Sequence, residues 1–348
     1  MKHFLIVGGG VAGYSLTIAL LNKNTKVTVL DSDENHGSAV AAGQINPIVF
    51  RRMNKSWRAD EYMPVARNLY EELESFSETA IIVDKQIRRL FAHDQERDEW
   101  LKRQELPEYE MYLEKLSEDD LNFSQAINIC GSGRVKQSYY VHAKNFLSAC
   151  QNYVSNHENG AYRKSKVNHS LVDAAKIEYK EEAFSGIIFC EGYKNFENPF
   201  FNFLQVDCTK GQLITVRSPI YKEESLNRKC FVMPIGSGEY KVGSTYEWNQ
   251  PNVKIDDAAK ELLRSNLASL VSERFEIIDQ IAGIRPTVKD RRPIMGEHPD
   301  LSGLYIFNGL GAKGYMMAPL LGQELAEFIL RGTELNKEVR LNRFKKKC

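Results

Sequence analysis

The chain has 348 residues, which is enough for two packed domains or one elaborate one. Its 43% hydrophobic and 26% charged residues are typical of a globular protein. Lys plus Arg and Asp plus Glu both number 46, so the net charge is zero and does not favour nucleic acid or a membrane surface as a partner. No apolar run approaches the roughly 20 residues that span a bilayer, and no signal-peptide pattern is found.

The six cysteines are scattered, at positions 130, 150, 190, 208, 230 and 348. None forms a Cys-x-x-Cys motif and none is spaced with histidines as in a zinc site, so we expect no metal. Isolated cysteines suit a reducing compartment. Together with the absence of a targeting signal, they lead us to expect a cytoplasmic protein.

The first part of the chain has the pattern of a dinucleotide-binding unit. An apolar strand leads into a Gly-x-Gly-x-x-Gly turn, a helix over 14–21 and a second strand over 26–31. Gly8 permits the tight turn, Gly10 lets the backbone approach a pyrophosphate, and Gly13 lets the helix pack on the strand. A glycine-rich turn without a ligand is the alternative, and the flanking strands and helix argue against it.

The end of this unit carries further binding signals. Val11 and Ala12 stand where the helix would point free N–H groups and a partial positive charge at the phosphates. Asp31 follows Gly8 by about 20 positions, where an acid holds a ribose hydroxyl. Because Ser32 and not an arginine comes next, the sequence favours a free 2′-hydroxyl over a 2′-phosphate.

Beyond Asp31 the alternation of strand and helix stops, which argues against an NAD-linked dehydrogenase. A small-residue loop over 37–47 precedes an amphipathic helix between Tyr62 and Leu73. The charged stretch 93–120 is expected to be an exposed helix. Further expected elements are strands at 81–83 and 87–91, a helix at 143–154, and strands at 162–167, 176–179 and 186–190, the last of them buried.

The region from 210 to 246 has three alternating strands separated by turns, which indicates an antiparallel sheet. The expected elements after it are a helix over 256–271, strands over 275–282 and 304–307, and a helix over 318–330 with Pro319 in its first turn. The pattern predicts a nucleotide-binding domain that is interrupted twice. Its segments are 1–80, 140–208 and 283–348, and the inserted domain consists of 81–139 and 209–282.

Several separated segments form a set. They are the glycine turn with Asp31, Ala41-Ala-Gly43, Lys210-Gly-Gln212, Val242-Gly-Ser-Thr245, Gly283-Ile-Arg-Pro286, Arg292-Pro-Ile-Met-Gly296 and Asn308-Gly-Leu-Gly-Ala-Lys-Gly-Tyr315. In order and spacing, this set resembles the FAD-dependent D-amino acid oxidase family, in particular glycine and sarcosine oxidases and the oxidase half of the bifunctional tRNA-wobble-uridine enzyme. The resemblance covers nearly the whole chain, although we recognise no motif of the family in 93–135.

The resemblance implies an α/β fold: a Rossmann-like FAD-binding domain of the glutathione-reductase type with an inserted antiparallel-sheet substrate domain. It also implies that FAD oxidises the C–N bond of an amino acid or a secondary amine. Hydride passes to flavin N5, the imine hydrolyses, and oxygen or another acceptor reoxidises the flavin. Some sarcosine oxidases attach flavin to a cysteine after the segment that matches 283–296. No cysteine occurs between 231 and 347 here, so we expect non-covalent FAD.

Three residues are candidates for the catalytic end of the site. Arg285 matches the family's carboxylate-binding arginine, whose planar fork suits a carboxylate; a structural salt bridge is the alternative. Phe231 stands where glycine oxidases usually have a tyrosine, which favours a bulkier or less polar substrate than glycine, unless it is plain sheet core. Lys241 matches a strand on which sarcosine oxidases place a lysine near N5 that promotes the reaction with oxygen; a solvated lysine is the alternative.

The predicted cofactor-binding residues come from several segments. Small residues after the second strand would cross the flavin face, Val167 would contact adenine through its backbone, and the last glycine-rich loop would wrap the pyrimidine edge. The set is Gly8, Gly10, Val11, Ala12, Gly13, Asp31, Ser32, Ala41, Ala42, Gly43, Gln44, Val167, Cys190, Glu191, Gly192, Gly309, Gly311, Ala312, Lys313, Gly314 and Tyr315.

Two other functions stay open at this point. The tRNA-modifying branch would remove a carboxymethyl group from an aminomethyl-uridine. Zero net charge, no basic stripe and no attached methyltransferase domain argue against nucleic acid as a partner. A flavin-binding protein without catalysis, acting as a sensor or an assembly partner, is compatible with Phe231 and with the unmatched segment 93–135.

Overall fold

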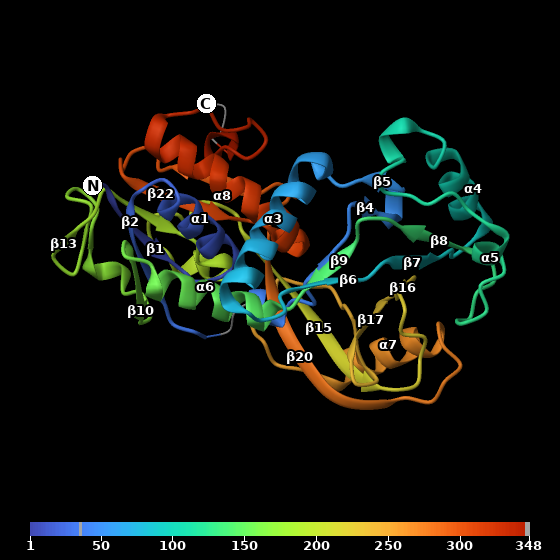
Figure 1. Ribbon diagram of the computed structural model, residues 1–348. Helices are drawn as coiled ribbons and strands as arrows, with labels where there is room; N and C mark the ends of the chain where they lie inside the picture. Colours follow the sequence, from blue (N-terminus) through green and yellow to red (C-terminus); the bar gives the residue numbers. More distant parts are fainter. Residues whose placement is uncertain (35–36, 345–348) are drawn as a thin grey trace.

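The computed structural model describes residues 1–34 and 37–344, and its two large sheets lie in different halves of the molecule (Figure 1). The first sheet has six strands, of which five run parallel and the edge strand β21 runs antiparallel to its neighbour. In spatial order they are β10 (Gly160–Lys164), β2 (Lys26–Asp31), β1 (His3–Val7), β14 (Gly186–Phe189), β22 (Leu304–Asn308) and β21 (Ile294–Glu297).

The first strand, turn and helix form as the sequence predicts. Every residue of α1 (Val11–Leu21) is buried, because the helix packs against β2 and is covered by α8 (Gly314–Arg331) and α6 (Ala143–Asn156). A helix that is apolar all round has no side for solvent, and four of the five residues of β1 are buried as well. The glycine turn between β1 and α1 is therefore fixed at both ends by buried, closely packed elements.

Helix α3 (Ala59–Ser77) confirms the amphipathic helix and packs on α8 and α6. Helix α8 corrects one expectation, because it begins at Gly314 and not at 318, so Pro319 lies inside it and not in its first turn. A proline has no N–H to donate to the carbonyl four residues earlier. Here that carbonyl, on Tyr315, accepts a hydrogen bond from the Tyr70 hydroxyl of α3 instead.

The second sheet has eight strands and confirms the antiparallel arrangement expected over 210–246, although β7 joins β16 in parallel. Helix α7 (Asp257–Ala268) covers one face of this sheet, where Ile214, Tyr240 and Val242 are buried. In spatial order the strands are β19 (Glu247–Trp248), β15 (Asp207–Arg217), β18 (Glu239–Gly243), β17 (Phe231–Gly236), β16 (Ser225–Asn227), β7 (Ile87–Leu90) and β8 (Ser132–Val135), with β20 (Glu276–Thr287) also paired to β15.

The stretch 93–120 is neither one helix nor exposed throughout, so that expectation was wrong. It contains α4 (Asp94–Arg103), a short turn of helix and α5 (Glu118–Leu121). Trp100 is fully buried against the backbone of Gly133, where a Cβ would lie only 2.5 Å from the indole. Buried aromatic side chains therefore attach this charged segment to the second sheet.

Smaller elements complete the chain. Two expected strands are shorter than predicted, since β10 ends at Lys164 and β12 contains only Glu178–Tyr179. None of the described helices is long and apolar enough to cross a membrane. The division at 80/81, 139/140, 208/209 and 282/283 stays a prediction. The remaining short elements are α2 (Gly37–Val40), β3 (Gln44–Ile45), β4 (Ile48–Val49), β5 (Asn54–Lys55), β6 (Ile82–Asp84), β9 (Tyr139–Val141), β11 (Val172–Asp173) and β13 (Glu182–Ala183).

Candidate active site

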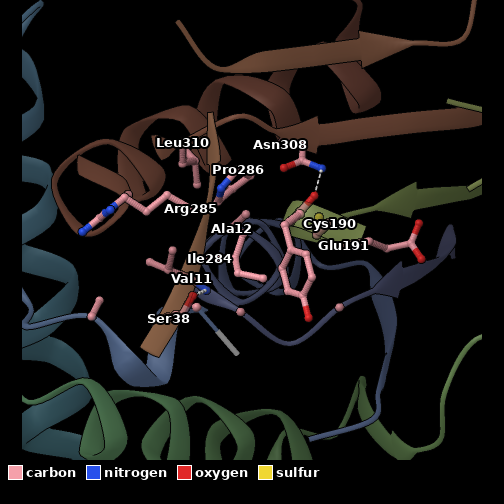
Figure 2. A pocket seen from close by; sticks show the side chains of 18 of the residues that line it. Val11, Ala12, Ser38, Cys190, Glu191, Ile284, Arg285, Pro286, Asn308 and Leu310 are labelled. Carbon is pink, nitrogen blue, oxygen red and sulfur yellow. Dashed lines mark hydrogen bonds between the residues drawn. The ribbon is translucent and has the colours of Figure 1, made fainter. Parts of the chain in front are cut away.

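A cavity of about 750 Å³ runs from the carboxyl ends of the parallel strands to the second sheet. Ligands of open parallel sheets bind at this edge of the strands. Figure 2 shows its wall formed by the start of α1, by the residues after β14 and β22, and by β20. In that view Arg285 and Glu191 extend in opposite directions, which defines two ends of the site.

The glycine turn is shaped for close approach of a ligand. Gly8 has a φ of 107°, and a Cβ there would lie 2.5 Å from the carbonyl oxygen of Cys190. A Cβ on Gly13 would lie 1.9 Å from the Gly8 oxygen, so the packing role predicted for Gly13 agrees with this contact. At the start of α1 the Val11 N–H donates to the hydroxyl of Ser38, 3.0 Å away. A helix N-terminus favours an anion such as a pyrophosphate, and in this structure the Ser38 hydroxyl occupies the Val11 N–H.

The acidic end of the cavity lies beside β2 and β14. Asp31 is only 7% exposed and lies against Gly9, where a Cβ would be 2.8 Å from its carboxylate. Glu191 accepts a hydrogen bond from Asn198 at 2.6 Å and pairs with the His169 ring at 3.0 Å. An acid at the end of the second strand, as Asp31 is, can receive the hydroxyl groups of a ribose.

The loop after β22 is tied to the other walls. Asn308 donates to the Gly192 carbonyl at 2.9 Å (Figure 2), and the Tyr315 hydroxyl donates to the Ser38 carbonyl at 2.9 Å. The Lys313 ammonium donates to the Asn46 carbonyl at 2.8 Å and also to Ser56. Burial lowers the pKa of Lys313 to about 8.

The other end of the cavity is built on the second sheet, and Arg285 from β20 is its charged group. Its guanidinium donates to the Ser244 hydroxyl at 2.6 Å and to the Thr245 carbonyl at 3.3 Å. No carboxylate of residues 1–34 or 37–344 lies within ion-pair distance of it. Burial lowers the pKa of this guanidinium. The alternative of a structural salt bridge therefore has no partner in the described chain.

Phe231 and Leu213 line the same end of the cavity. They flank Gly243 across three neighbouring strands, and a Cβ on Gly243 would meet both side chains. Lys241 lies two residues earlier on β18 and is not part of the cavity wall. Burial lowers the pKa of Lys241, and the charge of Lys144 lowers it further.

Most of the predicted residues surround this one cavity. Gly13, Gly309 and Lys241 do not line it, and every other predicted cofactor or catalytic residue does. Val167 is a lining residue, but it lies after β10 and not in a strand. The roles assigned to all these residues stay predictions.

Sequence reasoning missed several residues that the structure brings to the cavity wall. The segments 210–212 and 242–245 stood out as motifs without a role for Gly211 or Ser244, and Tyr246 comes directly after the second of them. Ser38 lies in the predicted small-residue loop, and its Oγ faces the first turn of α1. A hydroxyl residue in a loop of small residues was the available signal for Ser38. His169 had no signal in the sequence.

The fold and the cavity together define a class of protein, the dinucleotide-dependent oxidoreductases. A glycine turn, a buried acid after the second strand and a long cavity fit FAD, which would extend from Asp31 towards the second sheet. The sequence profile of the family described as DAO, FAD dependent oxidoreductase, matches residues 3–328. The chain therefore belongs to this family and is an FAD-dependent enzyme.

Individual relatives agree with this assignment. The uncharacterized oxidoreductase YurR of Bacillus subtilis (strain 168) is 26% identical over 97% of each chain. The tRNA 5-methylaminomethyl-2-thiouridine biosynthesis bifunctional protein MnmC of Campylobacter concisus (strain 13826) is 25% identical, over 85% of this chain but only 46% of its own length. The crystal structure of glycine oxidase from Geobacillus kaustophilus superposes with a TM-score of 0.79 at 18% identity and covers 94% of this chain and 95% of that one. That likeness confirms the predicted fold class.

Proposed function

We propose that this protein oxidises the C–N bond of an amino acid or a secondary amine that carries a carboxylate. Arg285 carries the proposal, because it places a guanidinium at the end of the cavity away from Asp31. No carboxylate in the described part of the chain neutralises it. A half-buried cation of this kind is stabilised by an anionic ligand, and amino-acid substrates supply one.

The residues of the chain would act mainly by orientation and by exclusion of water. Arg285 would hold the substrate carboxylate through parallel hydrogen bonds, which orients the neighbouring C–N bond. Leu213 and Phe231 line the same end and keep it apolar. When bound, FAD supplies the two-electron oxidation of the C–N bond, and oxygen or another acceptor takes the electrons afterwards.

Three further features belong to the proposal. The absence of cysteine between 231 and 347 supports non-covalent FAD. The cysteines within the described ranges are free thiols, which suits a reducing cytoplasm. Phe231 stands at a position where glycine oxidases usually have a tyrosine, and the loss of that hydroxyl favours a less polar substrate than glycine.

The first test is the visible spectrum of the purified protein, followed by anaerobic addition of glycine, sarcosine, D-amino acids and proline. We expect flavin bands that bleach with one of these compounds. Flavin bands that no amine bleaches would contradict the proposal and favour the non-catalytic interpretation.

Arg285→Ala provides the matching variant. We expect it to keep its flavin and to lose about 100-fold in substrate affinity, because a charge-assisted bidentate contact is removed. Arg217→Ala is the control, since Arg217 is 56% exposed and pairs with Glu239 at the far end of β15. Amine-dependent bleaching that is equal in both variants would exclude Arg285 from substrate binding.

A second candidate is oxidation of a modified base in tRNA, which the match to MnmC over 85% of this chain favours. Binding of bulk tRNA at low salt separates the two candidates. Phosphate contacts would give an affinity that falls steeply as salt rises, whereas an enzyme for free amino acids would retain no tRNA.

A further inference from the structure

The Arg285 guanidinium lies against the backbone of β15 at a glycine. Gly211 pairs with Gly283 across β15 and β20, and a Cβ on Gly211 would lie 2.2 Å from Nη2 and 2.4 Å from Nη1 of Arg285. Gly211 does not have a left-handed backbone, so its conformation does not demand glycine. A glycine inside a strand often marks a close approach, and here the approaching group is the arginine side chain.

An aromatic ring also covers the same guanidinium. The Cζ of Arg285 lies 4.3 Å from the centroid of the Tyr246 ring, within the range of a cation–π contact. Tyr246 is nevertheless 58% exposed and lines the cavity. The ring therefore forms an outer wall of the cavity at its arginine end.

These contacts leave hydrogen-bonding capacity for a ligand. A guanidinium has five N–H donors, and the described residues use two of them, towards Ser244 and Thr245. Gly211 and Tyr246 accept no hydrogen bond from Arg285; they restrict where its plane can lie. An arginine restricted in this way loses less conformational entropy when it binds a carboxylate.

We infer that Gly211 and Tyr246 are positioning residues for carboxylate recognition: Gly211 makes room for the guanidinium on β15, and Tyr246 covers it from the solvent side. This inference rests on the proposed function and deepens it. The contribution of Tyr246 comes from its ring and does not require its hydroxyl. This arrangement of Gly211, Tyr246 and Arg285 also differs from the one implied by the family resemblance, in which a tyrosine at the position of Phe231 lies beside the arginine.

The test uses the FAD-bound protein and a carboxylate that is not oxidised. Benzoate is titrated against the flavin spectrum, with benzamide as the neutral probe of the same shape. We expect Gly211→Ala and Tyr246→Ala each to weaken benzoate binding by about tenfold or more, while flavin content and benzamide binding stay unchanged. Tyr246→Phe should restore most of the affinity that Tyr246→Ala loses.

A control and a second readout keep the test decisive. Trp248→Ala removes another exposed aromatic residue, 54% accessible on β19 and not in the cavity wall, and should bind benzoate normally. Gly211→Ala should also lower the melting temperature in the native background and not in the Arg285→Ala background, where the methyl group finds room.

The outcomes separate this inference from the proposed function. A native protein that binds benzoate and benzamide equally has no carboxylate site, which overturns both. If the native protein prefers benzoate and the Gly211→Ala and Tyr246→Ala variants prefer it equally, only the positioning role is overturned. Loss of benzoate binding in both variants without loss of flavin supports it.

Discussion

Lys313 is a half-buried cation whose ammonium group has hydrogen bonds but no acidic partner among the described residues. It donates to the Asn46 carbonyl at 2.8 Å and to Ser56, and burial lowers its pKa to about 8. The protein must therefore either bury a charge near this site or release a proton from it. An anion bound in the cavity would favour the charged form.

This shift predicts a pH-dependent stability in the protein free of FAD. Between pH 8 and about 10.5 the unfolded chain binds a proton at Lys313 that the folded chain lacks, so stability rises with pH across this window. Lys313→Met should abolish the rise, so that the difference in unfolding free energy between native protein and variant changes by roughly 3 kcal/mol between pH 7 and 10.5. Urea unfolding of both proteins between pH 7 and 10.5 measures this difference in free energy. A difference that does not change with pH would contradict a lowered pKa of Lys313.

At the scale of elements, helix α8 depends on a side chain from α3. Pro319 leaves the Tyr315 carbonyl without its usual helical partner, and the buried Tyr70 hydroxyl donates to it. The Tyr315 hydroxyl in turn donates to the Ser38 carbonyl. The contact of two helices thus supports the loop that faces the start of α1.

Tyr70→Phe tests this dependence. We expect a loss of about 1–3 kcal/mol in the free energy of unfolding, because a buried carbonyl becomes unsatisfied. Tyr153→Phe is the control, because its hydroxyl bonds to Asn22 at the surface at 3.3 Å and should contribute under about 0.5 kcal/mol. Equal stability of the two variants in urea would show that the carbonyl finds another partner.

At the scale of the molecule, buried arginines of β7 connect the segment 93–135 to the second sheet. Arg88 pairs with Glu224, which directly precedes β16. It also pairs with Asp120 of α5 at 2.8 Å. Arg89 pairs with Glu96 of α4 at 2.7 Å. The segment 93–135, which lies within the residues that the family profile matches, is therefore an integral part of the fold.

Arg88→Ala should lower the free energy of unfolding by about 3–5 kcal/mol, since it leaves the buried Glu224 without its cation and Asp120 with only Arg134. Flavin content should be retained, because Arg88 does not line the cavity. Arg264→Ala, which removes an exposed pair with Glu261 on α7, should change stability by less than about 1 kcal/mol. Similar unfolding curves for the two variants would mean that the buried network contributes no net stability.

The sequence by itself determined the elements whose signals are local. The turn at Gly8, Gly10 and Gly13 was predictable because steric limits on the backbone act between near neighbours. The buried strand β14 and the antiparallel strands of 210–246 were predictable from apolar patterns. The family resemblance added FAD and Arg285, which local patterns alone do not identify.

Only the tertiary structure decided which distant residues meet. The start of α8 was misplaced because Pro319 suits a first turn, and the Tyr70 partner that lets it lie inside the helix comes from α3. The stretch 93–120 was expected to be exposed because it is charged, whereas Trp100 within it is buried against Gly133 of β8. Gly211 and Tyr246 reach Arg285 through the pairing of β15 with β20 and the turn after β18. Local periodicity can indicate a strand but does not say which distant strand it will pair with, and that choice is made by the packing of the whole domain.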